Sequence, residues 1–436
     1  MCYDDRLIEY IKANFENSKK EFDLINDKII SSDLNEKGTY SKMLAIPRVF
    51  LSEDIKIFED FVKTCFSIFN KIIDRYINDP EYRELFPFSD KLKELILLPK
   101  QYDVHIPMAR IDFFFDEITK SIKLCEINTD GTSGMNKTRI FNGLLTYSSA
   151  LRHVLGENYK TFELFDSWIE AFKLLWSQYS GGKSSPTVAI VDFLENVRLN
   201  EFKHFKETFE KHGINCLICD IRDLSYNGKS LSYQGTQIDI IYRRAVTSDI
   251  LANFEIVKPF IDAVMDNNVC IVGSFITQII HNKASFIVLH DNKTLAFMDE
   301  DERAFIKSHV PVTKMLSCLS VQEEDIFAGK DYWIIKPIDS YDSKGVYAGL
   351  DYDNDRWKAL IEQALETGDY LLQEFAVPYR SKNIDFSEEN PQVREFSNVT
   401  GAYCYNEKMY GIFSRLSHSN VIVPGVNQRD TVTIVV

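Results

Sequence analysis

The chain has 436 residues, of which 65 are acidic and 50 basic, and its net charge is −15 at pH 7. A chain of this length, with 45% hydrophobic and 13% aromatic residues, can fill the cores of two or three domains or of one large enzyme. The negative charge and the absence of a basic block argue against a nucleic-acid-binding protein. No window approaches the ~20 apolar residues of a membrane span and no leader pattern begins the chain, so we expect a cytoplasmic protein without membrane contact.

Helical patterns dominate the first part of the chain. Apolar positions recur every three or four residues among charges, which predicts helices over 4–16, 52–76, 90–97, 139–153 and 159–176. We therefore expect a helical N-terminal region over residues 1–100. A stretch rich in Ser and Gly at 177–186 marks a break before the next unit.

In residues 181–280, short apolar strands alternate with a helix. Strands are predicted over 187–191, 215–219 and 238–242, with a helix over 200–212. This alternation indicates a parallel sheet. Cys216 and Cys219 lie in one of these strands and point to opposite faces, so we interpret them as reduced core residues and not as metal ligands.

The last part of the chain, residues 281–436, begins helical and becomes rich in strands from Tyr332 onward. Among these strands one helix is predicted, over 355–366. Residues 380–395 are so polar that we expect a mobile loop there.

Two short predicted strands, 108–115 and 122–128, carry an unusual set of polar side chains. The polar segment between them favours an antiparallel hairpin. Because strand side chains alternate, Arg110 and Asp112 share one face, as do Glu126 and Asn128, while Ile111, Cys125 and Ile127 face the other way. Carboxylate and amide oxygens are ligands that Mg²⁺ prefers, so the polar face is a candidate metal site. A solvated hairpin face is an equally good interpretation of this motif alone.

A second polar motif follows the strand Trp333-Ile-Ile-Lys336-Pro337. Lys336 would project from the strand end, and the turn that contains Ser343 and Gly345 offers hydroxyl and backbone N–H groups for a phosphate. The chain has neither the Walker P-loop pattern nor the dinucleotide-binding glycine pattern, so another nucleotide-binding scheme is needed.

Taken in order, these motifs resemble those of the ATP-grasp ligases. The series is R-x-D, E-x-N-T-D, Asn282-Lys283 opening a helix, IIKP with its polar turn, LLQEF and G-I-F-S-Arg415. The acidic metal motif precedes the phosphate-binding lysines, an order that resembles the circularly permuted glutathione synthetases and, more closely, the glutathionylspermidine and trypanothione synthetases. The resemblance implies an α/β (α+β), circularly permuted ATP-grasp fold. Within it, residues 101–180 would belong to the ATP-grasp core, 181–280 to a preATP-grasp-like α/β substrate domain, and 281–436 to the nucleotide-binding domain.

The resemblance also implies a role for individual residues. Two Mg²⁺ ions and ATP would be the cofactors. Metal ligands would be Asp112, Glu126 and Asn128; nucleotide contacts would be Lys283, Lys336, Ser343, Gly345, Gln373, Glu374 and Phe375; Arg110 and Arg415 would be catalytic, and Thr129 and Ser133 would bind the acid substrate.

The reaction implied is ATP-dependent ligation of a carboxylate to an amine, through an acyl phosphate and without an enzyme nucleophile. The acid is a small molecule or peptide, and the amine is a polyamine or an amino acid. A ligase for another peptide or specialised metabolite, a kinase that releases the phosphorylated acid and a non-catalytic ATP-binding protein are the alternatives. The oligomeric state, including a homodimer, is left open by the sequence.

Overall fold

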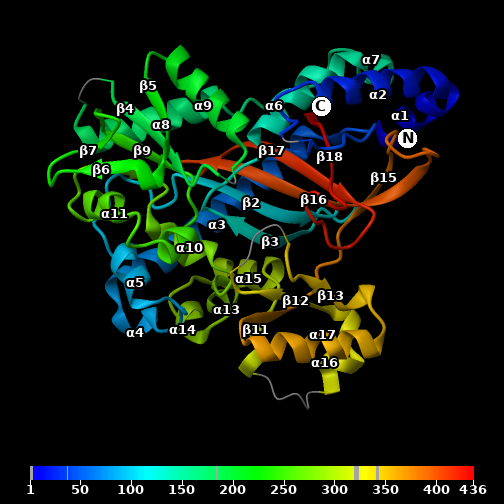
Figure 1. Ribbon diagram of the computed structural model, residues 1–436. Coiled ribbons are helices and arrows are strands. Elements are labelled where there is room, and N and C mark those ends of the chain that lie inside the picture. The colour runs from blue at the N-terminus through cyan, green and yellow to red at the C-terminus, as the bar shows by residue number, and fades with distance from the viewer. Residues whose placement is uncertain (1–2, 37, 183–184, 196, 319–323, 340–342) are drawn as a thin grey trace.

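A computed structural model gives the structure of the protein and describes residues 3–436 apart from 37, 183–184, 196, 319–323 and 340–342. Three sheets of four or more strands and the helices around them form the body of the molecule (Figure 1). The mixed α/β class expected from the sequence is confirmed.

The central sheet is antiparallel and combines segments far apart in the chain. The predicted hairpin is present as β2 (Met108–Phe115) and β3 (Ile122–Asn128). The C-terminal strand β16 (Val393–Tyr405) pairs with β2 on one side and with β17 (Lys408–Ser417) on the other. The sheet is completed by β18 (Arg429–Thr431) beside β17 and by β15 (Arg380–Ile384) beside β16.

One face of the central sheet is covered by the long helix α3 (Ser52–Asn78), as Figure 1 shows. Its apolar positions recur at helical spacing, so one stripe of the helix faces the sheet. Phe58 packs edge-on against Phe115, with ring centroids 4.7 Å apart, and Phe61 packs against Phe113 at 5.4 Å. This aromatic layer leaves the opposite face of β2 and β3 for polar side chains.

The predicted parallel sheet is confirmed, with strand order β10-β9-β4-β5. Its strands are β4 (Thr187–Asp192), β5 (Asn215–Asp220), β9 (Ile240–Arg243) and β10 (Cys270–Val272). The helices around it are α8 (Asp166–Ser180), α9 (Leu199–Lys211), α10 (Thr247–Ala252) and α11 (Lys258–Met265). Cys216 and Cys219 are buried in separate core clusters, so they are core residues as predicted.

A small antiparallel sheet lies below the central sheet in Figure 1. Its strand order is β11-β14-β12-β13, and the helix α17 (Asn354–Thr367) covers one face, with the buried Trp357 in the core between them. The strands are β11 (Thr313–Met315), β12 (Trp333–Pro337), β13 (Tyr347–Ala348) and β14 (Tyr370–Glu374).

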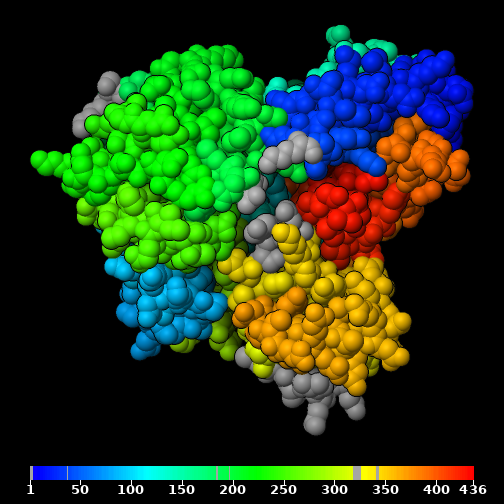
Figure 2. Space-filling view, in the orientation of Figure 1, coloured from blue at the N-terminus to red at the C-terminus, as the bar shows by residue number. Residues whose placement is uncertain are grey.

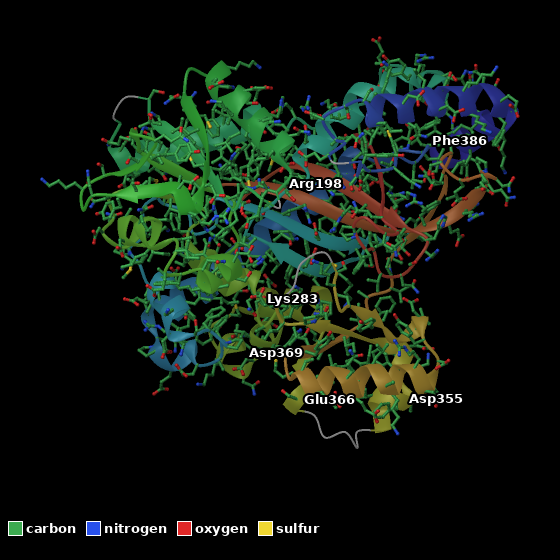
Figure 3. All side chains as sticks on the ribbon, viewed as in Figure 1. Arg198, Lys283, Asp355, Glu366, Asp369 and Phe386 are labelled. Carbon is green, nitrogen blue, oxygen red and sulfur yellow. The ribbon has the colours of Figure 1, made fainter. Side chains whose placement is uncertain are left out.

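The N-terminal helices α1 (Tyr3–Ala13) and α2 (Phe15–Ile30) do not have a core of their own. They pack with α7 (Ser149–Leu155) and with C-terminal residues, and the rings of Phe22 and Phe386 stack with their centroids 5.1 Å apart. Figure 3 shows Phe386 beside these helices. The strand β1 (Arg48–Phe50) pairs with β19 (Thr433–Val435) near the C-terminus. The two ends of the chain therefore share one core.

Several sequence expectations differ from the structure. Residues 380–395 are not a mobile loop, because β15 and the start of β16 lie within them. Asn383 of β15 is buried, but its amide is satisfied because it exchanges two hydrogen bonds with the backbone of Ile46, at 2.9 and 2.8 Å. Helix α2 extends well beyond the predicted end at residue 16, and the helices predicted over 139–153 and 159–176 are divided differently, with α6 at Met135–Leu144.

The remaining helices connect these layers, and the remaining strands form a separate antiparallel sheet. The helices are α4 (Pro80–Arg83), α5 (Asp90–Ile96), α12 (Gln278–His281), α13 (Ser285–Leu289), α14 (Asn292–Leu295), α15 (Glu300–His309) and α16 (Glu324–Ala328), and the strands, in their order in the sheet, are β6 (Leu224–Tyr226), β7 (Leu231–Tyr233) and β8 (Thr236–Ile238). Within the described part of the chain, no helix is both long and apolar enough to span a membrane.

Candidate functional site

A pocket of about 330 Å³ lies between the central sheet and the small sheet. Its walls come from β2 and β3, from α10 and α12, from β12 and β14, and from residues 420–424. In Figure 2 the green, yellow and red parts of the chain meet around this region. Segments as far apart in the sequence as Arg110 and Pro424 therefore meet at this site.

The polar face of the β2–β3 hairpin forms one wall. Arg110 is directly opposite Asn128 and Asp112 is opposite Glu126, so the four side chains lie together as the alternation predicted. Arg110 donates two hydrogen bonds to the Asp112 carboxylate, at 2.7 and 2.9 Å, and the Asn128 amide donates a third at 3.0 Å. These contacts fix the orientation of the Asp112 side chain.

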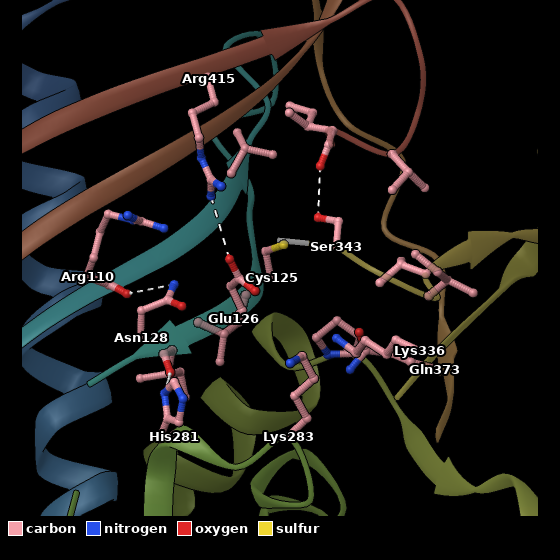
Figure 4. Close-up of a pocket in the computed structure, with 18 of the residues that line it drawn as sticks. Arg110, Cys125, Glu126, Asn128, His281, Lys283, Lys336, Ser343, Gln373 and Arg415 are labelled. Carbon is pink, nitrogen blue, oxygen red and sulfur yellow. Dashed lines mark hydrogen bonds and ion pairs between the residues drawn. The ribbon is translucent and has the colours of Figure 1, made fainter. Parts of the chain in front are cut away.

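Arg415 reaches the same carboxylates from β17. Its guanidinium pairs with Asp112 and lies 3.7 Å from Glu126 (Figure 4). Gly401 of β16 faces Asp112 across the ladder, and a Cβ atom at this position would lie only 2.6 Å from Asp112 Oδ1. The absence of a side chain at Gly401 thus leaves room for the Arg110–Asp112 pair.

The two facing carboxyl groups have different electrostatic surroundings. Burial raises the pKa of Asp112 above its ordinary value, although Arg110 and Arg415 oppose this change. Burial acts in the same direction on Glu126, but Arg415, a hydrogen bond with Asp112, Lys283 and Arg110 together hold the pKa of Glu126 well below its ordinary value. Glu126 is therefore the carboxylate that is ionised and open to the pocket.

Of the three predicted metal ligands, Glu126 and Asn128 are placed where they could bind a hard cation, and Asp112 is not. Glu126 and Asn128 line the pocket, and the Asn128 amide nitrogen faces Asp112, which leaves the amide oxygen on the other side. Asp112 is completely buried, is not among the lining residues and has both oxygens engaged. No cluster of three His, Cys, Asp or Glu side chains that could hold a metal occurs among the described residues. A metal here would need oxygens from ATP or water as well.

The two predicted phosphate-binding lysines lie across the pocket from the arginines (Figure 4). Lys336 precedes the last residue of β12, and its ammonium lies 5.0 Å from the centre of the Phe286 ring. Burial, together with the nearby positive charge of Lys283, lowers the pKa of Lys336 to about 8. Lys283 is held in place by its backbone N–H, which donates to the carbonyl of Ile338 at 3.4 Å.

Strand β14 and the residue after it form the end of the pocket predicted for adenine. Gln373, Glu374 and Phe375 all line it. The Gln373 amide donates to the Thr313 hydroxyl at 2.7 Å, and the Glu374 carboxylate accepts from the backbone of Val312 at 3.0 Å. The backbone N–H of Phe375 donates to the carbonyl of Tyr332 at 2.8 Å, so it is not free to bind an adenine base.

The remaining predicted residues divide into those that line the pocket and those that do not. Ser133 and Ser343 line it, and the Ser343 hydroxyl donates to the carbonyl of Ile422 at 2.8 Å across the pocket mouth. Thr129 does not, because its hydroxyl points inward to the carbonyl of Thr277 at 3.0 Å. Gly345 lies outside the lining, and its positive φ of 73° shapes the turn instead.

The structure adds pocket residues that sequence reasoning did not assign. Cys125 was expected on the opposite face of β3, but the register shifts between Asp112 and Phe113, so Cys125 is an extra residue that lines the pocket. No sequence signal marks this bulge. His281 also lines the pocket, and burial lowers its pKa, so its ring is neutral near pH 7.

No protein-family model and no curated protein sequence matches this chain. Among solved structures, a glutathione synthetase-like effector from Globodera pallida is similar over 95% of this chain and 96% of its own, with 13% sequence identity and a TM-score of 0.63. A candidate gamma-glutamylcysteine synthetase from Methylobacillus flagellatus covers 89% of this chain and 90% of its own, at 10% identity and a TM-score of 0.44. D-alanyl-alanine synthetase A from Vibrio cholerae is similar over 56% of this chain and 69% of its own, at 14% identity and a TM-score of 0.30.

The first of these similarities establishes the fold. This chain has a glutathione synthetase-like fold along nearly its whole length, in agreement with the ATP-grasp fold that the sequence motifs imply.

Proposed function

We propose that this protein is an ATP-dependent ligase that joins a carboxylate to an amine through an acyl phosphate. One observation supports this proposal above all. A single pocket contains an ionised carboxylate and an amide oxygen from one hairpin, two lysines from the facing elements and two arginines beside them. This combination of charges suits the transfer of a phosphoryl group.

Within this proposal, the residues have separate tasks. Lys283 and Lys336 bind the ATP phosphates, and the β14 end of the pocket receives the adenine. Glu126 and Asn128 would hold Mg²⁺, which neutralises phosphate charge when bound. Arg110 and Arg415 orient Asp112 and Glu126 and face the site where the carboxylate substrate is phosphorylated.

The second half of the reaction needs an amine and no enzyme nucleophile. Burial raises the pKa of the Cys125 thiol to about 12, so this cysteine is protonated and unreactive at neutral pH. The amine attacks the acyl phosphate directly and releases phosphate. The pocket walls reduce the access of water, which would otherwise hydrolyse the intermediate.

The more specific expectations belong to the same proposal. The sequence resemblance favours a glutathionylspermidine synthase-like reaction in a circularly permuted ATP-grasp ligase, with the domain limits given above, a cytoplasmic location and small-molecule partners only. A ligase for another peptide or specialised metabolite would use the same residues.

The test is ADP release by the purified protein with Mg-ATP, across a panel of acids that includes glutathione, γ-glutamyl peptides and amino acids, each with and without polyamines or amino acids. ADP release that needs one acid and one amine, with an amide product in the mass spectrum, is expected. Release with the acid alone would indicate a kinase. ATP binding without release across the panel would favour a non-catalytic ATP-binding protein.

A further inference from the structure

One end of the pocket adjoins helix α10, beyond the predicted phosphate-binding lysines, and has a distinct character. It is bounded by residues 131–133 after β3, by Val246 and Ser248 at the start of α10, and by Asp339 after β12. We call this the α10 end. Arg110 connects it to the carboxylate cluster, because its guanidinium donates to the carbonyl of Ser133 at 2.9 Å. A substrate whose carboxylate is bound beside Arg110 has the α10 end as the adjoining space.

Two arginines stand directly behind this end, yet both are neutralised by the protein. Arg243 is paired with Asp130 at 2.6 Å, and its side chain has no exposed surface. Arg244 is paired with Glu201 at 3.3 Å and is also buried. Neither arginine lines the pocket. A buried, paired guanidinium offers little attraction to a further anion.

The same network fixes the wall of the pocket. The second oxygen of Glu201 accepts hydrogen bonds from the backbone N–H groups of Gly134 and Asn136, at 3.0 and 3.1 Å, where helix α6 begins. A helix start of this kind favours an anion. In this protein the anion is supplied by Glu201, so the position is not available to a substrate carboxylate.

The charge that does reach the α10 end is negative. Asp339 lines the pocket, and Arg110, the arginine whose side chain contacts the other described residues bounding this end, has its charge paired with Asp112. Asp249 lies nearby on α10, and burial together with the negative charges of Asp130 and Asp339 raises its pKa. An additional anion would meet these carboxylates, and a cation would relieve their mutual repulsion.

We propose that the acid substrate carries one carboxylate, the one that is activated, and presents a neutral or positively charged group to the α10 end. The inference rests on the proposed ligase function and narrows the acid to a class. It disfavours acids with a second carboxylate at the far end, such as dicarboxylates and γ-glutamyl peptides, and so favours the alternative of a ligase for another peptide or specialised metabolite over a glutathionylspermidine synthase-like reaction.

Three four-carbon acids of matched length test this proposal: succinate, succinamate and 4-aminobutyrate, which end in a carboxylate, an amide and an ammonium group. Their dissociation constants are measured by NMR titration against the protein with Mg-ADP present. We expect succinamate and 4-aminobutyrate to bind about ten-fold tighter than succinate, because like charges at close range disfavour binding. Equal or tighter binding of succinate would overturn the proposal, and so would failure of all three to bind.

A charge reversal supplies the second measurement. Asp339→Lys should reverse the order so that succinate binds tightest, whereas Glu366→Lys makes the same charge change at an exposed position on α17 (Figure 3). An unchanged order in Asp339→Lys, or an equal change in Glu366→Lys, would contradict a local charge effect. These measurements record binding and need no turnover. A result that contradicts the proposal about the acid substrate can therefore be distinguished from an absence of ligase activity.

Discussion

At the scale of single residues, Asp112 and Glu126 show how two facing carboxylates acquire different tasks. Asp112 is completely enclosed by Arg110, Asn128 and Arg415, whereas the Glu126 side chain is 32% exposed and faces the pocket. Removing one partner of a buried ion pair leaves an uncompensated charge, which is strongly destabilising. We therefore interpret Asp112 as the residue that orients the cluster and Glu126 as the one that binds a metal.

Glu126→Gln should weaken metal binding and leave the fold intact. The substitution keeps the shape of the side chain and removes the charge that attracts a divalent cation, so we expect the affinity for Mn²⁺ in the presence of ADP to fall by about ten-fold or more. Electron paramagnetic resonance of free Mn²⁺ measures this affinity. Glu374→Gln, at the other end of the pocket, is the control. Equal Mn²⁺ affinity in both variants would remove Glu126 from the metal site.

The pKa of Lys336 predicts a pH dependence of nucleotide binding. A lysine with a pKa of about 8 is charged below pH 8 and loses its charge above it. Binding of ATP phosphates by the charged form must then take up a proton above pH 8, so ATP affinity should fall by up to about ten-fold per pH unit. Isothermal titration calorimetry between pH 7 and 9.5 checks this expectation. Lys336→Arg, whose guanidinium stays charged, should show a flat profile, and a parallel fall in both proteins would refute the assignment.

At the scale of elements, β15 is a strand that its sequence pattern did not predict. The segment lacks the apolar alternation of a strand because Ser381 and Asn383 occupy buried positions, where hydrogen bonds satisfy them. The side-chain amide of Asn383 makes the two hydrogen bonds with the backbone of Ile46 that a neighbouring strand would otherwise make. Only the folded partner, which is 337 residues away, makes this polar segment suitable for a sheet.

Asn383→Leu tests this interpretation. The substitution leaves the buried N–H and C=O groups of Ile46 without partners, so we expect the free energy of unfolding to fall by roughly 2–5 kcal/mol. Lys382→Leu, at the exposed neighbouring position, should change it by no more than about 0.5 kcal/mol. Urea unfolding of both variants gives the comparison, and a small effect of Asn383→Leu would show that water or a backbone shift replaces the lost hydrogen bonds.

The β2–β3 hairpin and the parallel sheet could be predicted because the residue patterns that specify them lie within short, continuous segments of the sequence. Alternation along 108–128 placed Arg110, Asp112, Glu126 and Asn128 on one face, and the paired register confirms that arrangement. The bulge that turns Cys125 into the pocket breaks the same alternation without a sequence signal. The contact between Arg415 and Asp112 spans 303 residues, so no periodicity could predict it, and only the resemblance to ATP-grasp ligases suggested that the two belong together.

At the scale of the whole molecule, the N-terminal helices belong to the same core as the C-terminal strands. Phe22 and Ile29 of α2 pack in one cluster with Phe386, Val432 and Ile434. A shared core of this kind couples the two ends of the chain in unfolding. The N-terminal region predicted from the sequence is therefore expected to unfold with the C-terminal strands and not as a separate unit.

Phe22→Ala should destabilise the entire protein in one transition. Phe22 is 2% exposed, so its truncation should cost about 3–5 kcal/mol. Leu24→Ala lies on the same helix at a position that is 45% exposed and should cost less than about 1 kcal/mol. Denaturant unfolding followed by both tryptophan fluorescence and circular dichroism is the measurement. Two separate transitions, of which only one shifts in Phe22→Ala, would show that the N-terminal helices form an independent domain.

The position of β16 between β2 and β17 also determines when the protein can mature during synthesis. Until the ribosome has added residues 393–405, β2 remains an unpaired edge beside its hairpin partner, with backbone groups open to other chains. Arg415, which completes the carboxylate cluster, is added later still. The central sheet of the nascent chain thus stays incomplete until these segments have been made, so chaperones can bind its open edge, and the pocket is completed only after Arg415 has been added.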